Sequence, residues 1–225
     1  MYKDIKIGVI IPTRGDRPEL LSKCLHQLDK QTLKPDTIEL VNYPPAKEDE
    51  CDITWRYRIG CNRFISKKSA DVVFLIEDDD YYSLDYIETM MNEWEKNKKP
   101  IIFGLGQTTY YHLGIKKWQL MDHPHRASAF CTMLTIDGIK NMKWPKDDYP
   151  FTDLELWKIL KGKTTTTKEQ LAIGIKGHKN GTLFGGMGHY SERFGYKNDD
   201  SNLSWLKSKI DEESFLFYEK IMEKC

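Results

Sequence analysis

The sequence predicts an α/β fold with a mostly parallel central sheet, helices on both faces, and a flexible loop followed by a helix near the C-terminal end. Apolar, β-branched segments alternate with amphipathic segments of helical spacing over the first eighty residues. A glycine-rich stretch at 177–195 interrupts this alternation late in the chain. Neither a linker nor an internal repeat divides the 225 residues, so we expect a single domain.

The first five elements form a β-α-β-α-β alternation. A β-branched run ends at Pro12, and Pro18 stands where a helix can begin. A second run follows Pro35 and ends before Pro44, which cannot continue a strand. We expect strands at 5–11, 37–41 and 72–76 and helices at 18–31 and 53–69. Such alternation favours parallel strands with right-handed crossovers and a ligand crevice at the carboxyl ends of the strands.

The later elements follow from the same periodicities. Apolar spacing predicts helices at 84–96, 153–160 and 205–224, strands at 101–104, 130–135 and 171–176, and a hairpin at 108–120. The threonine-rich segment 163–168 is typical of a mobile surface loop. The stretch 177–195 contains too much glycine to belong to the core.

Charge and cysteine content exclude several classes of protein. Acidic and basic residues number 34 each, so no overall field draws the protein to nucleic acid or to a membrane. The five cysteines are scattered and never in C-x-x-C spacing, which argues against a disulfide framework or a zinc site. No apolar stretch is long enough to span a membrane, and the first residues lack the apolar core of a signal peptide. We therefore expect a cytoplasmic protein without a transmembrane segment; no pattern indicates its oligomeric state.

Four consecutive carboxylates, Glu77 to Asp80, stand where the predicted strand at 72–76 leaves the sheet. Like charges at one strand end repel, and a divalent cation that also holds phosphate oxygens would make the cluster favourable. The alternative is a solvated acidic turn before a helix, whose dipole favours carboxylates at Asp80 and Asp85. The run of residues alone favours neither interpretation.

Three motifs together resemble the nucleotide-sugar glycosyltransferases of GT-A fold, family-2 type. They are Ile11-Pro-Thr-Arg-Gly-Asp-Arg-Pro18, the leucine-rich helix that ends in Gln31-Thr32, and the acidic strand end. Asn62 stands fifteen positions before Glu77, where that family often has an Arg-Asn pair, although Cys61 replaces the arginine. Tyr149-Pro-Phe-Thr-Asp-Leu-Glu-Leu-Trp157 is similar to the family's acceptor-side Glu-Asp helix start, with Thr152 in place of the glutamate.

The resemblance covers residues 5 to about 160 and implies a single GT-A, Rossmann-like domain. Within that domain it implies a nucleotide-sugar-binding half at 1–104, an acceptor-side half with the active-site loop at 105–200, and a C-terminal helix at 201–225.

The resemblance also implies a Mn²⁺ or Mg²⁺ ion bound by Asp79, at the position of the second aspartate of D-x-D. Glu77-Asp78-Asp79 departs from that motif in beginning with glutamate. His178 or His189 would complete the metal site, and His178 directly follows the predicted strand end. Asp78 would face sugar or ribose hydroxyls, and Asp80 would cap the next helix.

A UDP-sugar is the implied donor, with its base between the ends of the first two strands and Tyr43 available to stack on it. Arg14 is favoured as a donor contact, whereas Arg17 is expected to be a helix-start residue. The expected donor-binding residues are Pro12, Thr13, Arg14, Asn42, Tyr43, Asn62, Asp78, His189 and Arg193, the last two on a loop that closes over the phosphates.

Asp153 stands where the family carries its general base, which implies inverting transfer of a sugar to a hydroxyl acceptor. In a retaining enzyme Asp153 would only orient that acceptor. The acceptor is expected to be a glycan or a hydroxylated nucleobase in DNA.

Two other functions remain open from the sequence. A nucleotidyltransferase of related architecture also uses acidic strand ends and a metal, but Gly15 alone supports the glycine-rich phosphate loop that it needs. A non-catalytic carbohydrate-binding module needs neither the acidic cluster nor a base.

Overall fold

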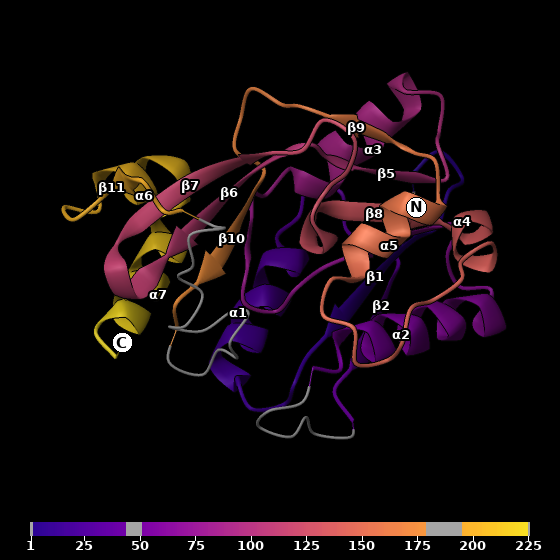
Figure 1. Cartoon of the computed structure of the whole chain (residues 1–225), viewed down its shortest axis with the longest axis horizontal. Coiled ribbons are helices and arrows are strands. Elements are labelled where there is room, and N and C mark those ends of the chain that lie inside the picture. Colours follow the sequence, from indigo (N-terminus) through magenta and orange to yellow (C-terminus); the bar gives the residue numbers. More distant parts are fainter. Residues whose placement is uncertain (1, 44–50, 179–194, 225) are drawn as a thin grey trace.

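The computed structural model of the chain describes residues 2–43, 51–178 and 195–224 and shows two β-sheets with helices packed around them (Figure 1). The expected α/β fold is confirmed. The helices of the described residues are α1 (Pro18–Asp29), α2 (Ile53–Lys67), α3 (Tyr86–Lys96), α4 (Ile136–Lys140), α5 (Thr152–Ile159), α6 (Ser204–Lys209) and α7 (Glu212–Met222).

The larger sheet carries the expected parallel strands. Its order is β2 (Thr37–Val41), β1 (Ile7–Pro12), β3 (Val72–Leu75), β8 (Thr132–Thr135), β5 (Ile102–Leu105) and β9 (Lys163–Thr165). Strand β1 runs parallel to β2 and β3, and β5 runs parallel to β9. Only β8 is antiparallel to its neighbours β3 and β5. The carboxyl ends of β1, β2 and β3 therefore meet at one edge.

The smaller sheet contains the predicted hairpin. Its order is β11 (Asn198–Asp199), β7 (Lys117–Asp122), β6 (Gln107–His112), β10 (Ala172–Lys176) and β4 (Tyr81–Tyr82). Strands β6 and β7 form the hairpin, β10 runs parallel to β6, and β4 pairs antiparallel with β10. The short segment between β3 and β4 thus carries the chain from the larger sheet to the smaller one, and this segment is the acidic cluster.

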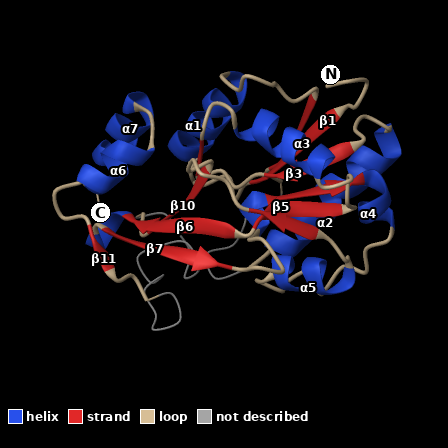
Figure 2. Cartoon of the chain, turned by 90° about the horizontal axis from the view of Figure 1, so that it is seen from above, coloured by secondary structure: helices blue, strands red, loops and turns tan. Residues whose placement is uncertain are grey.

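Helices cover both faces of the larger sheet. Figure 2 shows α1 and α3 on one face and α2, α4 and α5 on the other. In α1, Pro18 occupies the first turn and Leu20, Cys24 and Leu28 recur every four residues on the buried side. Helix α3 buries a similar stripe with Met90 in its middle.

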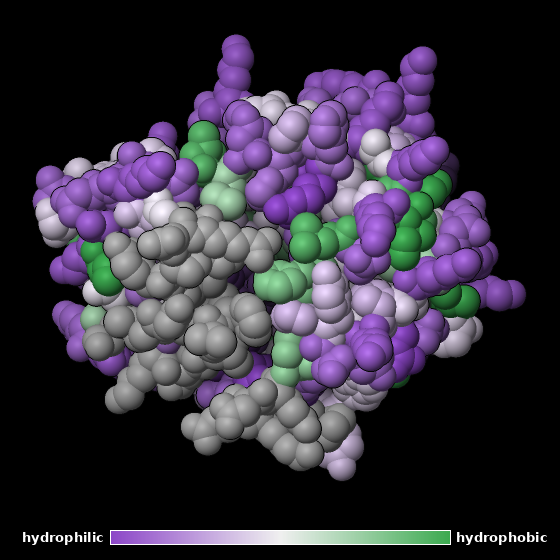
Figure 3. All heavy atoms as spheres, in the orientation of Figure 1, coloured by the Kyte–Doolittle hydropathy of each residue, from purple (hydrophilic) through white to green (hydrophobic). Residues whose placement is uncertain are grey.

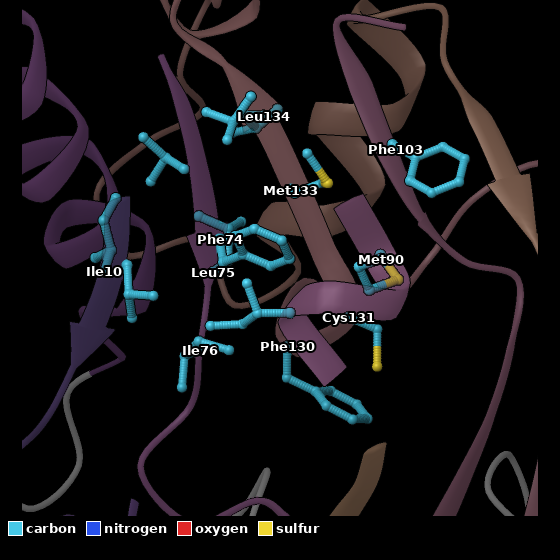
Figure 4. Close-up of a cluster of buried hydrophobic side chains, with 14 of the residues drawn as sticks. Ile10, Phe74, Leu75, Ile76, Met90, Phe103, Phe130, Cys131, Met133 and Leu134 are labelled. Carbon is cyan, nitrogen blue, oxygen red and sulfur yellow. The ribbon is translucent and has the colours of Figure 1, made fainter. Parts of the chain in front are cut away.

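The main core lies between these helices and the larger sheet. Figure 4 shows its centre, where side chains from β1, β3, β5, β8 and α3 meet. Ile10, Phe74, Phe103 and Leu134 are fully buried there. Burial on both faces explains why β1 and β3 have uninterrupted apolar sequences.

Two predicted elements differ from the structure. The expected continuous helix 205–224 is wrong, because Ile210 is extended and Asp211 starts α7 by accepting a hydrogen bond from the Ser214 N–H at 2.9 Å. The predicted loop 163–168 is wrong at its start, because Lys163–Thr165 forms β9 on the edge of the larger sheet. Most of the glycine-rich stretch, residues 179–194, lies outside the described residues.

The described surface offers few apolar areas. The face in Figure 3 is mainly hydrophilic, with small separate hydrophobic patches. None of the described helices is long and apolar enough to cross a membrane.

Gly104 tests the packing of β5 against α5. A Cβ at this position would stand 2.4 Å from the Ala127 Cβ and 2.6 Å from the Cys131 carbonyl oxygen. We expect Gly104→Ala to lower the free energy of unfolding in urea by about 1–3 kcal/mol, because neither neighbour is a flexible chain end. Gly114→Ala, at an exposed position in a short turn, is the control, with an expected change within about 0.5 kcal/mol. Equal stability of the two variants would contradict the close packing around Gly104.

Candidate active site

The acidic cluster lies at the carboxyl end of β3, between the two sheets. Asp78, Asp79 and Asp80 are 2%, 5% and 1% exposed, whereas Glu77 is partly exposed. The Glu77 N–H donates a hydrogen bond to the Tyr82 hydroxyl at 3.0 Å, which fixes the start of the cluster. Such burial excludes the interpretation of a solvated acidic turn, because four carboxylates lose most of their hydration here and need cationic partners.

Arg17 is the first such partner. It occupies the N-cap position of α1, as expected for a helix-start residue, but its side chain turns into the cluster. Its guanidinium donates to Asp79 Oδ2 at 2.8 Å and to Asp78 Oδ1 at 2.7 Å. Arg17, which was expected only to start the helix, is thus the arginine that reaches the acidic residues, and the donor contact expected of Arg14 stays a prediction. Arg14 instead contacts Asp16, with Nε 3.3 Å from Oδ2.

His178 reaches the same carboxylate from the smaller sheet. Its Nε2 lies 2.9 Å from Asp79 Oδ2, and its ring is buried. The two residues expected to share a metal are thus brought together. Burial alone would raise the pKa of Asp79, but Lys176, Arg17 and His178 together hold it well below its usual range.

Lys176, the last residue of β10, is the second fixed cation. Its Nζ donates to Asp80 Oδ1 at 3.1 Å and lies 3.8 Å from Glu77 Oε2. Burial opposes a charged amine, but Asp80, Asp79 and Glu77 raise the pKa of Lys176 well above its usual value. The expectation that Asp80 caps the next helix is wrong. Its Oδ1 also accepts the Ile175 N–H at 2.8 Å, so Asp80 binds β10 instead.

Glu77 faces the open side of the cluster. The Tyr57 hydroxyl, from the buried side of α2, lies 3.4 Å from Glu77 Oε1. Loss of hydration raises the pKa of Glu77 to about 7, against the opposing effect of Lys176 and with help from Asp79 and Asp153.

The expected donor-binding residues differ in how close they lie to the acidic cluster and in how exposed they are. Thr13 is buried after β1, and its side chain hydrogen-bonds Asp78. Pro12 ends β1, whereas Asn42 and Tyr43 are exposed beyond the end of neighbouring β2. Asn62 lies on the exposed side of α2, away from the face that carries Tyr57 to the cluster. His189 and Arg193 lie outside the described residues.

Asp153 lies in the first turn of α5, on the acceptor side. Its Oδ2 accepts a hydrogen bond from Arg126 Nη1 at 2.8 Å, and Arg126 Nη2 lies 3.1 Å from His123 Nε2. Asp153 is near enough to Glu77 to raise its pKa. Asp153 therefore lies within electrostatic range of the cluster, while its carboxylate is hydrogen-bonded to Arg126.

The cluster has the composition of a divalent cation site. Glu77, Asp79 and Asp80 each present an oxygen within 4.8 Å of the others. The cluster holds four carboxyl groups against two fixed cations, Arg17 and Lys176. Asp78 Oδ2 and Asp80 Oδ2 are buried without a hydrogen-bond partner among the described residues. The donors are all hard oxygen ligands, which fit Mg²⁺ or Mn²⁺. The site fits such an ion, with Asp80 added to the set that the sequence predicted.

Sequence reasoning missed Arg17, Lys176, Tyr57 and Arg126. One signal was available for Lys176, because a lysine at the end of the apolar strand Ala172-Ile-Gly-Ile-Lys176 must be buried with a partner. For Arg17, its place after β1 put it at the same sheet edge as the end of β3. Tyr57 and Arg126 carried no comparable signal, because a helix tyrosine and a loop arginine are common without any functional role.

Comparison with known proteins was made at the level of sequence and of structure. The sequence matches no protein-family model and no curated protein. Among solved structures, A197 from STIV matches with a TM-score of 0.50 and 13% identity over 72% of this chain and 82% of that one. S. aureus TarS 1-349 with UDP-GlcNAc matches with a TM-score of 0.55 and 9% identity over 76% of this chain and 59% of that one. The same TarS fragment with UDP matches with a TM-score of 0.53 and 12% identity over 76% of this chain and 60% of that one.

At these identities the likeness shows the fold alone, and the chain spans about six tenths of the TarS fragment. The chain therefore shares the fold of the TarS fragment.

The ion pair between Lys176 and Asp80 gives a direct test of the cluster. We expect Lys176→Met to cost about 3–5 kcal/mol of unfolding free energy in buffer with chelator, because Asp80 is left buried without its cationic partner. The double variant Lys176→Met/Asp80→Asn removes both charges, and urea denaturation should give a cost below the sum of the single costs by more than about 1 kcal/mol.

Lys158→Met is the control, because that exposed amine lies 3.5 Å from Glu155 on the surface and contributes little. Additive costs for Lys176→Met and Asp80→Asn would show that the two side chains do not form the pair.

Proposed function

We propose that this chain is a metal-dependent glycosyltransferase of GT-A, family-2 type that moves a sugar from a UDP-sugar to a hydroxyl acceptor. The buried acidic cluster carries this proposal. It lies at the edge where parallel strands end, it has more carboxyl groups than fixed cations, and Asp153 of α5 is near enough to raise the pKa of Glu77. TarS, which shares this fold, has UDP-GlcNAc and UDP in its solved structures.

The donor binds, in this proposal, across the ends of β1, β2 and β3. Thr13 and Arg14 lie on one side of the base and Asn42 on the other, and the exposed ring of Tyr43 stacks on the base. Asp78 holds sugar or ribose hydroxyls. Asn62 is exposed on α2, on the side away from the cluster. It can contact the donor only if α2 presents a different side to the donor than it does in this structure.

Glu77, Asp79 and Asp80, with His178 beside Asp79, are the residues that would hold the Mn²⁺ or Mg²⁺ ion. When bound, such an ion supplies Lewis-acid stabilisation of the leaving UDP. Lys176 holds the Asp80 side chain in place for that role, and Arg17 does the same for Asp79.

Asp153 acts as the general base in the proposed reaction. Its carboxylate takes the proton of the acceptor hydroxyl while the acceptor oxygen bonds to the anomeric carbon of the sugar. The bond from that carbon to the UDP oxygen breaks, and its electron pair leaves with UDP, so the configuration inverts. Arg126 orients the carboxylate through the 2.8 Å hydrogen bond. The proposed acceptor is a glycan or a hydroxylated nucleobase in DNA.

Release of UDP tests the proposed function and the role of Asp79. A panel of UDP-sugars with Mn²⁺ should give UDP, first with water as acceptor. Asp79→Asn should reduce this release at least about a hundredfold, because the leaving diphosphate loses its charge stabilisation. Asp148→Asn, which changes an exposed carboxylate before α5, is the control and should retain wild-type activity. Full activity of Asp79→Asn would remove its assigned role.

A parallel assay with a nucleoside triphosphate and a sugar phosphate distinguishes the nucleotidyltransferase reaction. Pyrophosphate from a nucleoside triphosphate and a sugar phosphate, with no UDP from any UDP-sugar, would replace the proposed function.

Asp153 is expected to affect the chemical step and not donor binding. Asp153→Asn should lower the rate of UDP release about 10²–10⁴-fold, because the amide cannot accept the proton. The affinity for UDP, measured by calorimetry with Mn²⁺, should stay within about threefold of wild type, with Asp148→Asn again as control. A parallel loss of UDP affinity would place Asp153 in the donor site instead.

A further inference from the structure

Arg17 joins two carboxylates of the acidic cluster. Its guanidinium bridges Asp78 Oδ1 and Asp79 Oδ2, and the Arg17 side chain is only 10% exposed. The bridge joins the loop after β1 to the loop after β3. Arg17 Nε is buried without a hydrogen-bond partner among the described residues and lies 3.7 Å from Asp16 Oδ1. The arginine therefore has unused donor capacity at the mouth of the cluster.

A divalent cation in this cluster would use a carboxylate that Arg17 already contacts. Asp79 belongs to the three-carboxylate set, and its Oδ2 accepts from both Arg17 and His178. Two cations on one carboxylate repel each other, and little solvent separates them in a buried site. Arg17 in this position must therefore weaken the binding of a free metal ion.

A diphosphate reverses this balance. The guanidinium forms paired hydrogen bonds to phosphate oxygens as readily as to carboxylates. Once the phosphates are present, Arg17 can exchange Asp78 and Asp79 for them, and the carboxylate oxygens become available to the metal. Asp78 Oδ2, buried without a hydrogen-bond partner among the described residues, shows that this carboxylate has further capacity of its own.

We propose that Arg17 is a diphosphate-binding residue that rests on Asp78 and Asp79 in the absence of donor, so that the divalent cation and UDP bind as a coupled pair. This inference rests on the proposed function, because it takes the UDP-sugar and the cation from there. Coupling is reciprocal, so UDP must increase the affinity for the metal by the same factor as the metal increases the affinity for UDP.

Binding of Mn²⁺ to the full chain, followed through the electron paramagnetic resonance signal of the free ion, tests the coupling without any catalysis. For the wild type we expect UDP to tighten Mn²⁺ binding at least about tenfold. For Arg17→Gln we expect Mn²⁺ alone to bind about tenfold more tightly than to wild type, and UDP to change that affinity less than about threefold. UDP itself should bind Arg17→Gln more weakly than wild type.

Two further variants keep the test interpretable. Arg58→Gln removes an arginine of α2 that pairs with Asp147 on the surface, with distances of 2.8–3.1 Å, and should behave as wild type. Arg17→Gln/Asp78→Asn removes the cation together with one of its carboxylates, so it keeps the net charge of the cluster. It should fold even where Arg17→Gln does not, which circular dichroism checks, and should still bind Mn²⁺ without help from UDP.

Three results would overturn the inference. They are equal Mn²⁺ affinity of wild type with and without UDP, unchanged Mn²⁺ affinity on removal of Arg17, and no Mn²⁺ binding by any variant in either condition. In each case, release of UDP from a UDP-sugar by the wild type would leave the proposed glycosyl transfer standing. If Mn²⁺ and UDP bind with strong coupling but no UDP-sugar releases UDP, the proposed glycosyl transfer would be overturned and the role of Arg17 would stand.

Discussion

The burial of four consecutive carboxylates between two sheets is the constraint on which the rest of this structure depends. Uncompensated charges cannot stay there, because each loses most of its hydration. Arg17 comes from the start of α1, and Lys176 and His178 come from the end of β10. The positions of α1 and of the smaller sheet relative to β3 are therefore fixed by electrostatics as well as by apolar packing.

The same arrangement separates two chemical tasks. On one side of the cluster, the ends of β1 and β2 form an edge suited to a nucleotide, with Thr13 as its link to Asp78. On the other side, α5 presents Asp153, whose orientation is set by Arg126. Glu77 lies between the two sides, and its pKa is lowered by Lys176 and raised by Asp153. The proposed inverting transfer needs this division, because the nucleophile attacks the carbon from the side opposite to the departing group.

The regular elements could be predicted from the sequence because their signals are local. The strand at 37–41 and the helix that starts at 53 agree with the structure, since Pro35 and the apolar periodicity mark them. The break at Ile210 and the strand β9 could not be predicted in this way. The first depends on one side-chain cap at Asp211, and the second on a neighbouring strand distant in sequence. In the site, Asp79, His178 and Asp153 were predicted from motif positions. Asp80 was assigned to the wrong partner because its contact, Lys176, lies 96 residues further along the chain.

The link through β4 has a consequence for how the molecule is assembled. Asp79 receives its partners from residues 17 and 178, so both partners are present only after residue 178 has been synthesised. A ribosome-bound fragment ending before β10 contains the acids and Arg17 but lacks Lys176. Contacts between such distant segments form late and slowly, so the acids of the N-terminal β-α-β-α-β unit have Arg17 but lack Lys176 until β10 is present. The acidic cluster therefore gains its second fixed cation only when β10 has been synthesised and has folded onto the smaller sheet.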